Sequence, residues 1–210
     1  ENAQGEPISL PQLDLPGGGT KEDPYLISSA SDLEKINEDL GAFFELVSDI
    51  NMDPNLPGKN VYERAVIAPD TNNDRGYSGT PFVGTLNGKG FKIIGLNINT
   101  SEHMNNYTGY LGLFGVINGG KIRNLGIENA NIAGGYGAVY IGALCGLYLE
   151  GTITNCNATG SFDGGNNSEF LGGLCGYNYN GTITNCLVDG VVTAGENSEH
   201  LGGLCGYNDD

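Results

Sequence analysis

The sequence is poor in positive charge and contains no tryptophan. Nine Lys and Arg stand against 25 Asp and Glu, which gives a formal net charge of −16, and the last of the nine is Arg123. A surface with this balance repels phosphate backbones and anionic lipid headgroups. We therefore expect no nucleic-acid partner, whereas cations and neutral sugars remain compatible with the composition.

Long apolar runs are also absent. No stretch reaches the roughly 18 consecutive apolar residues that a membrane-spanning helix needs, so we expect no membrane insertion. The chain opens on the polar residues Glu1 to Gln4, which do not resemble a signal peptide. We expect that a leader has been removed from a secreted or cell-surface protein.

Glycine is abundant, with 36 residues, and it recurs within an internal repeat. Residues 141–170 and 171–200 align without gaps, both carrying Leu-Cys-Gly followed by Gly-Thr-Ile-Thr-Asn-Cys. A third copy begins at Leu201 and its second half is missing at Asp210, while residues 84–98 and 112–127 are degenerate copies. A fixed period of this length is typical of solenoid architectures.

Each repeat alternates with the period of a strand, as in Thr152 and Thr154 on either side of Ile153. Such short strands between glycine-rich turns cannot bury enough surface alone, but stacked turns can. The sequence therefore predicts an all-β fold, a right-handed parallel β-helix (β-solenoid) with ~30-residue rungs. Equivalent residues would then form ladders, one of them from Leu144, Leu174 and Leu204, and another from Ile153 and Ile183.

The first part of the chain has a different pattern. Leu33, Ile36 and Leu40 have helical spacing, and Ser29 or Ser31 is available as an N-cap, so we expect a short N-terminal α-helix that caps the first turn. We divide the chain into an N-terminal extension (1–18), the capping helix with first irregular rungs (19–80), and β-helix repeats with an incomplete last repeat (81–210).

The repeat units resemble the GLUG-motif proteins, a family named for a G-L-x-G element. That element occurs here at 112–115, 173–176 and 203–206, and Ala143 replaces its first glycine at 143–146. Residues 19–27 and 82–90 resemble the segments that often precede such repeats. The resemblance implies a β-helical fold on exported or surface proteins of bacteria, including adhesin-like chains and accessory regions of secreted enzymes. It supplies no active site.

The five cysteines follow the repeat period, and two interpretations remain open. They can form buried thiol ladders in place of small apolar residues. Alternatively, Cys145 can form a disulfide with Cys156, and Cys175 with Cys186, within each turn.

One further segment carries candidate metal ligands. Asp70, Asn72 and Asp74 have the one-three-five spacing of a calcium loop. Arg75 stands where such a loop needs glycine, and an Asx-rich turn explains the same residues. Calcium is therefore a weak candidate, and we expect no other cofactor.

We predict an extracellular structural scaffold, adhesin-like or filament-forming, and expect no catalysis. Its ligand would be a glycan or a protein on a face studded with tyrosine. The unfinished last turn is compatible with head-to-tail self-assembly and is explained more simply by truncation of a longer protein. The alternative is a polysaccharide-active lyase or hydrolase, or its accessory region. For that alternative the candidate basic groups are few: Arg64, Arg75, Lys89, Lys92 and His103. The proposed face consists of Tyr136, Tyr140, Tyr148, Tyr177, Tyr179 and Tyr207.

Overall fold

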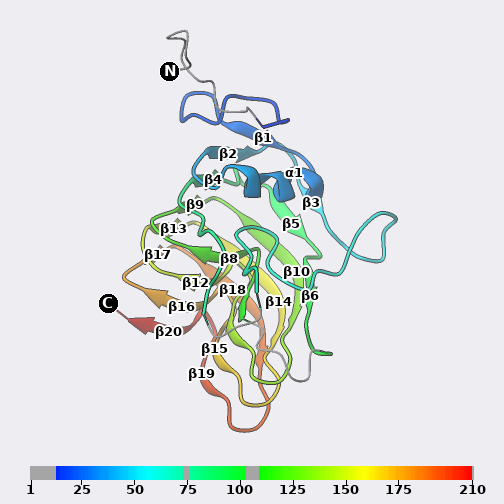
Figure 1. The fold of residues 1–210 in the computed structure, drawn as a ribbon, viewed down its shortest axis with the longest axis vertical. Coiled ribbons are helices and arrows are strands. Elements are labelled where there is room, and N and C mark those ends of the chain that lie inside the picture. The colour runs from blue at the N-terminus through cyan, green and yellow to red at the C-terminus, as the bar shows by residue number, and fades with distance from the viewer. Residues whose placement is uncertain (1–12, 73–75, 103–108, 210) are drawn as a thin grey trace.

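The chain winds into a β-solenoid whose strands lie in four sheets (Figure 1). The computed structural model describes residues 13–72, 76–102 and 109–209. The strand pairings within each sheet are parallel, for example those that join successive turns through Cys145, Cys175 and Cys205. The all-β parallel solenoid predicted from the repeat is therefore confirmed.

Two six-stranded sheets form the longer walls of the solenoid. The first sheet contains, in spatial order, β1 (Tyr25–Ile27), β2 (Phe43–Leu46), β4 (Thr85–Asn87), β9 (Lys121–Arg123), β13 (Thr152–Thr154) and β17 (Thr182–Thr184). The second contains β3 (Ile50–Asn51), β5 (Lys92–Ile94), β10 (Gly126–Ala133), β14 (Asn157–Asp163) and β18 (Leu187–Thr193), with β6 (Asn97–Asn99) also paired to β10.

Two four-stranded sheets, which begin at Gly109 and Phe114, complete the later turns. The third sheet consists of β7 (Gly109–Leu111), β11 (Val139–Ile141), β15 (Glu169–Gly172) and β19 (Glu199–Gly202). The fourth consists of β8 (Phe114–Ile117), β12 (Cys145–Tyr148), β16 (Cys175–Tyr179) and β20 (Cys205–Asp209). The strands of these two sheets end the stack near the C-terminus in Figure 1.

The sequence period is also the period of the structure. The Leu144 amide donates to the Leu174 carbonyl at 2.9 Å, and the Leu174 amide donates to the Leu204 carbonyl at 2.9 Å. Ile153 pairs in register with Ile183. Both predicted ladders therefore join adjacent turns, and the parallel register places like side chains directly over one another.

One turn contains a compensated irregularity. Val139 pairs with Gly109 thirty positions earlier, but Cys145 pairs with Phe114, thirty-one positions earlier. The register returns to thirty through a shift between Ile127 and Ala130 in β10. Asn129 lies within this shift and has a φ of 53°. A β-bulge there absorbs the extra residue, so the following turns remain aligned.

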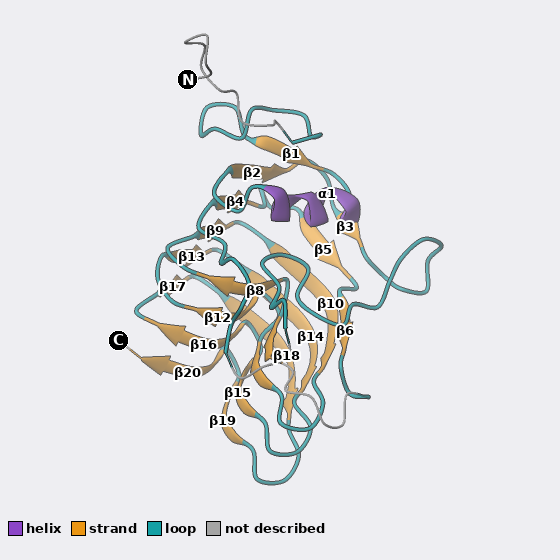
Figure 2. Ribbon diagram, in the orientation of Figure 1, coloured by secondary structure: helices purple, strands orange, loops and turns teal. Residues whose placement is uncertain are grey.

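The predicted N-terminal helix is present and is shorter than residues 31–40. It comprises α1 (Ala30–Lys35), followed by the 3₁₀ turn η1 (Ile36–Glu38), and it is the short helical segment drawn in purple in Figure 2. The Asn37 side chain donates to the Glu34 carbonyl at 2.9 Å, which gives that carbonyl a partner outside the helical ladder. The helix connects β1 to β2. Because β1 precedes the helix and is the outermost strand of the first sheet, the helix lies within the first turn.

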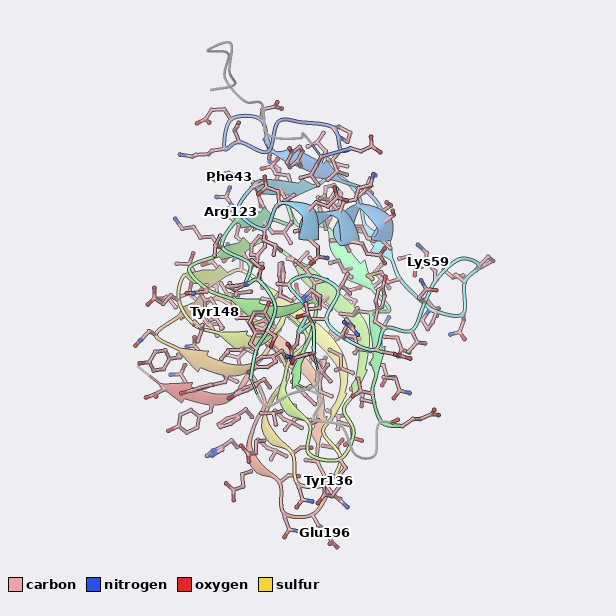
Figure 3. All side chains as sticks on the ribbon, viewed as in Figure 1. Phe43, Lys59, Arg123, Tyr136, Tyr148 and Glu196 are labelled. Atoms are coloured by element: carbon pink, nitrogen blue, oxygen red, sulfur yellow. The ribbon has the colours of Figure 1, made fainter. Side chains whose placement is uncertain are left out.

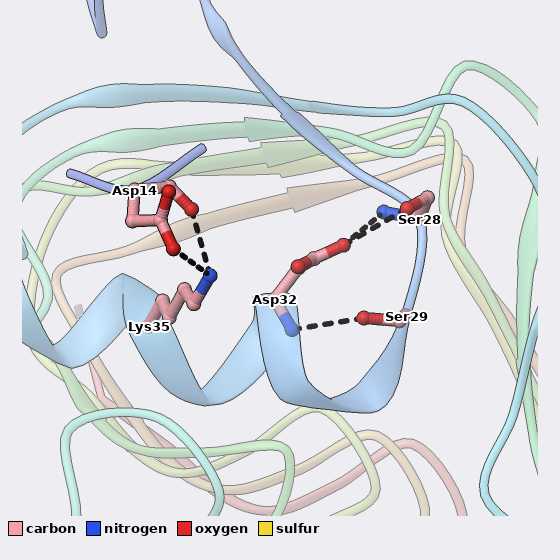
Figure 4. A network of polar contacts seen from close by, with 5 residues as sticks. All are labelled: Asp14, Ser28, Ser29, Asp32 and Lys35. Atoms are coloured by element: carbon pink, nitrogen blue, oxygen red, sulfur yellow. Dashed lines mark hydrogen bonds and ion pairs between the residues drawn. The ribbon is translucent and has the colours of Figure 1, made fainter. Parts of the chain in front are cut away.

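Local polar contacts fix the start of this helix (Figure 4). Ser29 is the N-cap, and its hydroxyl accepts a hydrogen bond from the Asp32 amide at 3.2 Å. The Asp32 carboxylate accepts from the amide and the hydroxyl of Ser28 at 3.0 and 2.9 Å. Lys35 donates to the Asp14 carbonyl at 2.7 Å and so ties the last turn of the helix to the preceding segment. The bond from the Asp32 amide to Ser29 satisfies an amide that the start of a helix leaves unpaired.

A single hydrophobic core runs along the inside of the coil. Leu13 and Leu15, which the sequence-based division assigns to the extension, are buried in the same core as Leu33. An internal row of rings extends this core through the first turns, with centroids 4.8 to 6.4 Å apart, and contains Tyr25, Phe44, Phe82 and Phe114. The first irregular turns and the regular repeats therefore share one interior.

Candidate functional site

Four ring side chains form a continuous row at one corner of the solenoid. The row, called the aromatic row below, consists of Tyr110, Tyr140, Phe170 and His200, one from each of the four strands of the third sheet. Successive ring centroids lie 4.9, 5.1 and 4.8 Å apart, with interplanar angles of 24°, 8° and 4°. The ring spacing matches the strand spacing of about 4.8 Å, so the rings stack as the strands stack.

The backbone at every member of the aromatic row is left-handed. Tyr110 and Tyr140 have φ values of 60°, and Phe170 and His200 have φ values of 56°. Asparagine accepts this region readily, but a bulky ring residue there costs roughly 1–2 kcal/mol. Strained backbone of this kind is concentrated at functional sites. Its recurrence in four successive turns marks this corner as the candidate functional site.

The second glycine of the G-L-x-G element lies against the same corner. A Cβ atom on Gly146 would lie 2.5 Å from both the Tyr110 Cα and the Tyr140 carbonyl oxygen. A Cβ atom on Gly176 would lie 2.7 Å from the Phe170 carbonyl oxygen, and a Cβ atom on Gly206 would lie 2.7 Å from the His200 carbonyl oxygen. Only glycine fits at such approaches. The second glycine of the repeat motif and the residues of the aromatic row therefore pack against each other at the same corner.

Two tyrosines of the fourth sheet, Tyr177 and Tyr207, lie beside the aromatic row and are called the flanking tyrosines below. Tyr177 lies 5.2 Å from Phe170 and nearly parallel to it, at 21°. Tyr207 stands at 78° to His200 with its centroid 4.9 Å away, and it is 39% exposed. Tyr207 therefore meets the row edge to face and keeps part of its ring accessible to solvent.

Two tyrosine hydroxyls at this corner, those of Tyr140 and Tyr177, stay protonated at neutral pH because their pKa values are raised. Burial, and then the charge of Glu169, raise the pKa of Tyr140. Loss of solvent and the nearby Asp209 carboxylate raise the pKa of Tyr177, whose hydroxyl donates to Asp209 at 3.3 Å. The corner therefore offers neutral hydroxyl groups together with apolar rings, a combination suited to an uncharged polar ligand.

The tyrosine face predicted from sequence is only partly formed. Tyr140, Tyr177 and Tyr207 belong to the corner described above, and Tyr179 is 44% exposed beside Tyr177. Tyr148 is fully buried, so its assignment to the face was wrong: it follows the inward alternation of β12. Tyr136 is exposed at a loop tip near Glu196, at the lower end of Figure 3, and not with the other rings.

Sequence reasoning missed Tyr110, Phe170 and His200 as members of one row. A signal was present, because each of the four row residues stands directly before Leu-Gly or Ile-Gly. The signal is hard to interpret without coordinates, since no aromatic residue is expected in left-handed backbone.

The cysteines form two ladders across turns. Cys145 Sγ lies 3.5 Å from Cys175 Sγ, with Cys205 next in register, and all five cysteines are free in the structure. Cys156 and Cys186 form the second ladder, and the interaction with Cys156 lowers the pKa of Cys186 to about 7. This is the arrangement of the thiol-ladder interpretation; the disulfides Cys145–Cys156 and Cys175–Cys186 stay predictions.

The calcium candidate is described only in part. The Asp70 carboxylate accepts from the Ser78 amide at 2.9 Å, and the Asn72 side chain donates to the Ser78 hydroxyl at 2.6 Å. Asp74 lies outside the described residues. In the part of the chain that is described, no three His, Cys, Asp or Glu side chains gather as a metal site. Calcium binding at this turn stays a prediction.

Of the basic residues considered for an enzyme, the three that the structure describes each contact a different partner. Lys89 pairs with Glu45 at 3.6 Å, and Lys92 pairs with Glu128 at 2.7 Å. Arg64 donates to the Asp70 carbonyl at 3.5 Å, while Arg75 and His103 lie outside the described residues. Three different partners therefore hold the three described cations.

Thirty-residue turns, parallel strands and recurrent glycine corners define the class of this protein as a β-solenoid repeat protein. A family model described as the GLUG motif matches residues 137–162 and 170–193. The chain thus carries the GLUG motif at two sites, which confirms the resemblance seen in the sequence.

Two similar proteins carry names associated with cell surfaces. The chain is 36% identical over 134 residues to a protein named as a Gly-rich membrane protein of Evansella cellulosilytica, and 32% identical over 152 residues to halomucin of Haloquadratum walsbyi. These alignments cover 62% and 69% of this chain but 14% and 2% of the relatives. The chain therefore corresponds to a small part of each relative.

One solved structure shares the fold. It is a crystal structure from Bacteroides ovatus described as an immunoglobulin A1 protease, with a TM-score of 0.59 and 21% identity over 92% of this chain and 64% of the other. At this identity the similarity shows the fold alone. Within the described residues, no helix has the length and hydrophobicity required to cross a bilayer.

Proposed function

We propose that the chain is a non-catalytic scaffold segment of a secreted or cell-surface protein, and that it binds neutral carbohydrate at the corner formed by the aromatic row and the flanking tyrosines. The surface assignment is supported by the names of the two relatives and by the GLUG repeats. An adhesin-like role follows if the ligand is a glycan of another surface.

The observation that carries the proposal is the left-handed backbone at all four residues of the aromatic row. A corner with asparagine would avoid the strain, and the same solenoid uses asparagine in left-handed backbone at Asn124, Asn155 and Asn185. The rings therefore have a cost that simple packing does not require. Rings and tyrosine hydroxyls together suit saccharides, which present apolar C–H faces and polar hydroxyl edges.

The test is affinity electrophoresis of the 210-residue chain through gels that contain neutral polysaccharides, followed by calorimetry with oligosaccharides of any that retard it. We expect the double variant Tyr177→Ala, Tyr207→Ala to lose about tenfold in affinity, equivalent to roughly 1.4 kcal/mol. The matched control is Tyr136→Ala, which removes a more exposed ring, 60% against 39% for Tyr207, at a distant loop tip.

Equal binding by the double variant and by the control would contradict the proposed site. Retention of the native circular dichroism spectrum in both variants separates lost binding from lost folding. Release of reducing ends from a bound polysaccharide would contradict the non-catalytic role. Head-to-tail self-assembly stays a prediction, which sedimentation velocity at increasing concentration tests.

A further inference from the structure

Positive charge is concentrated in one groove on the outer surface of the first sheet. The groove has a volume of about 600 Å³, and three of the nine basic residues of the chain line it: Lys21, Lys121 and Arg123. A fourth, Lys89, is paired with the groove residue Glu45. This concentration is unexpected in a chain with a net charge of −16.

The strand register places the basic side chains in the middle of the groove. Ile122 is buried, so its neighbours Lys121 and Arg123 both point outward from β9. Lys121 lies in a row between Thr85 and Thr152 of the adjacent strands. Arg123 lies in a second row, between Asn87 and Thr154. Each cation is therefore flanked by uncharged polar side chains, of which Asn87 is buried and already bonded to Glu45 and Asn124.

Among the described residues, no carboxylate neutralises the cations that line the groove. Glu45 is the acidic residue among those that line the groove, and it is already engaged by Asn87 at 3.0 Å and by Lys89 at 3.6 Å. Within the described ranges, Lys21, Lys121 and Arg123 form no ion pair. The groove thus presents three unpaired positive charges to solvent.

Local charge outweighs the net charge of the chain at this site. Charges separated by more than a Debye length of about 8 Å are largely screened at physiological ionic strength. A ligand in the groove therefore responds to the nearby cations more than to acidic residues on other turns. An extended polyanion would also meet those acidic turns, so the groove favours a short anionic segment.

The uncharged lining identifies the class of anion. Phe43, from β2, lines the same groove and is partly exposed, and Figure 3 shows it on the same flank as Arg123. Ring, amide and hydroxyl groups between cations are suited to a sugar that carries an acid group. We propose that this groove binds acidic glycan segments, with Arg123 and Lys121 contacting the carboxylate or sulfate. The site is separate from the aromatic corner, so its test is independent of the proposed function.

The experiment measures binding of the full chain to short oligomers of four polymers at 50 and 200 mM salt by microscale thermophoresis. Hyaluronan carries carboxylates, chondroitin sulfate carries both carboxylates and sulfates, dextran is neutral, and single-stranded DNA is a phosphate polyanion. We expect binding to at least one of the first two that weakens at the higher salt, with no comparable binding to dextran or DNA. Hyaluronan binding distinguishes carboxylate recognition from a requirement for sulfate.

The variant Lys121→Gln, Arg123→Gln should lose at least tenfold in affinity for the bound glycan. Both side chains are exposed, so little change in thermal midpoint is expected. The control Lys59→Gln removes one positive charge from a loop on the opposite flank in Figure 3 and should change affinity less than twofold. Unchanged binding by the double variant, equal loss in the control, equal binding of DNA, or no binding of either acidic glycan would overturn the proposal.

Discussion

The left-handed backbone of the aromatic row predicts an unusual order of variant stabilities at Phe170. Replacement by alanine removes the stacked ring and keeps a Cβ atom at a φ of 56°, whereas glycine removes both. A Cβ in this region costs roughly 1–2 kcal/mol. The extra freedom of glycine in the unfolded chain costs about 0.4–1 kcal/mol. The difference leaves Phe170→Gly more stable than Phe170→Ala by about 1 kcal/mol, although both fall below the wild type.

Tyr177 is the matched control, because it lies 5.2 Å from Phe170 but has ordinary strand backbone. There the usual order applies, and Tyr177→Gly should be less stable than Tyr177→Ala by about 0.5–1 kcal/mol. Equilibrium urea unfolding followed by circular dichroism measures all four variants against the wild type. The same order of glycine and alanine at both positions would refute the assignment of left-handed strain to the row.

Three further predictions concern the core, the thiols and the asparagine ladder. Leu174→Ala should lower the free energy of unfolding by about 3–5 kcal/mol, because it leaves a cavity in the core. Leu204→Ala should lower it by only about 1–2 kcal/mol, because Leu204 is 37% exposed. Equal losses of the two variants in urea titration would contradict the ladder of leucines. The pKa of Cys186 is lowered to about 7, so its rate of reaction with a disulfide reagent should rise through pH 7. Cys186→Ser should remove this fast-reacting thiol. A rate that rises only above pH 8 would contradict the lowered pKa. Asn124→Ala removes hydrogen bonds of 3.1 Å to Asn87 and to Asn155 and places alanine at a φ of 53°. The free energy of unfolding from urea titration should therefore fall by about 2 kcal/mol, and Asn124→Gly should recover part of this loss.

The repeat made most of the fold predictable from sequence. Identical residues thirty positions apart can lie on one ladder only if the chain coils with that period, and the pairings of Leu144 with Leu174 and of Ile153 with Ile183 follow directly. The short helix was also predictable, since Ser29 and the spacing of Leu33 and Ile36 are local signals. Its early end was not, because Asn37 bonds to a distant carbonyl, that of Val66.

The candidate sites were less predictable, because both depend on which side chains the turns bring together. Tyr148 and Tyr177 are both tyrosines of neighbouring repeats, yet one points into the core and the other lies at the corner. The basic groove joins Lys21 to Arg123 across about half of the chain, and only the stacking of strands makes them neighbours. Composition alone predicts repulsion of anions, because the net charge of −16 does not reveal that three basic side chains gather at this groove.

The compensated bulge in β10 has a consequence for how such a protein can grow. Because an added residue is absorbed within one turn, errors of spacing do not propagate, and an inserted segment of thirty residues adds one complete layer of about 4.8 Å. Every such duplication would also add one more ring to the corner at the same spacing. If the corner binds carbohydrate as proposed, copy number sets the valency of the surface, and avidity for a repeating polymer rises with each added turn without any change in an individual contact.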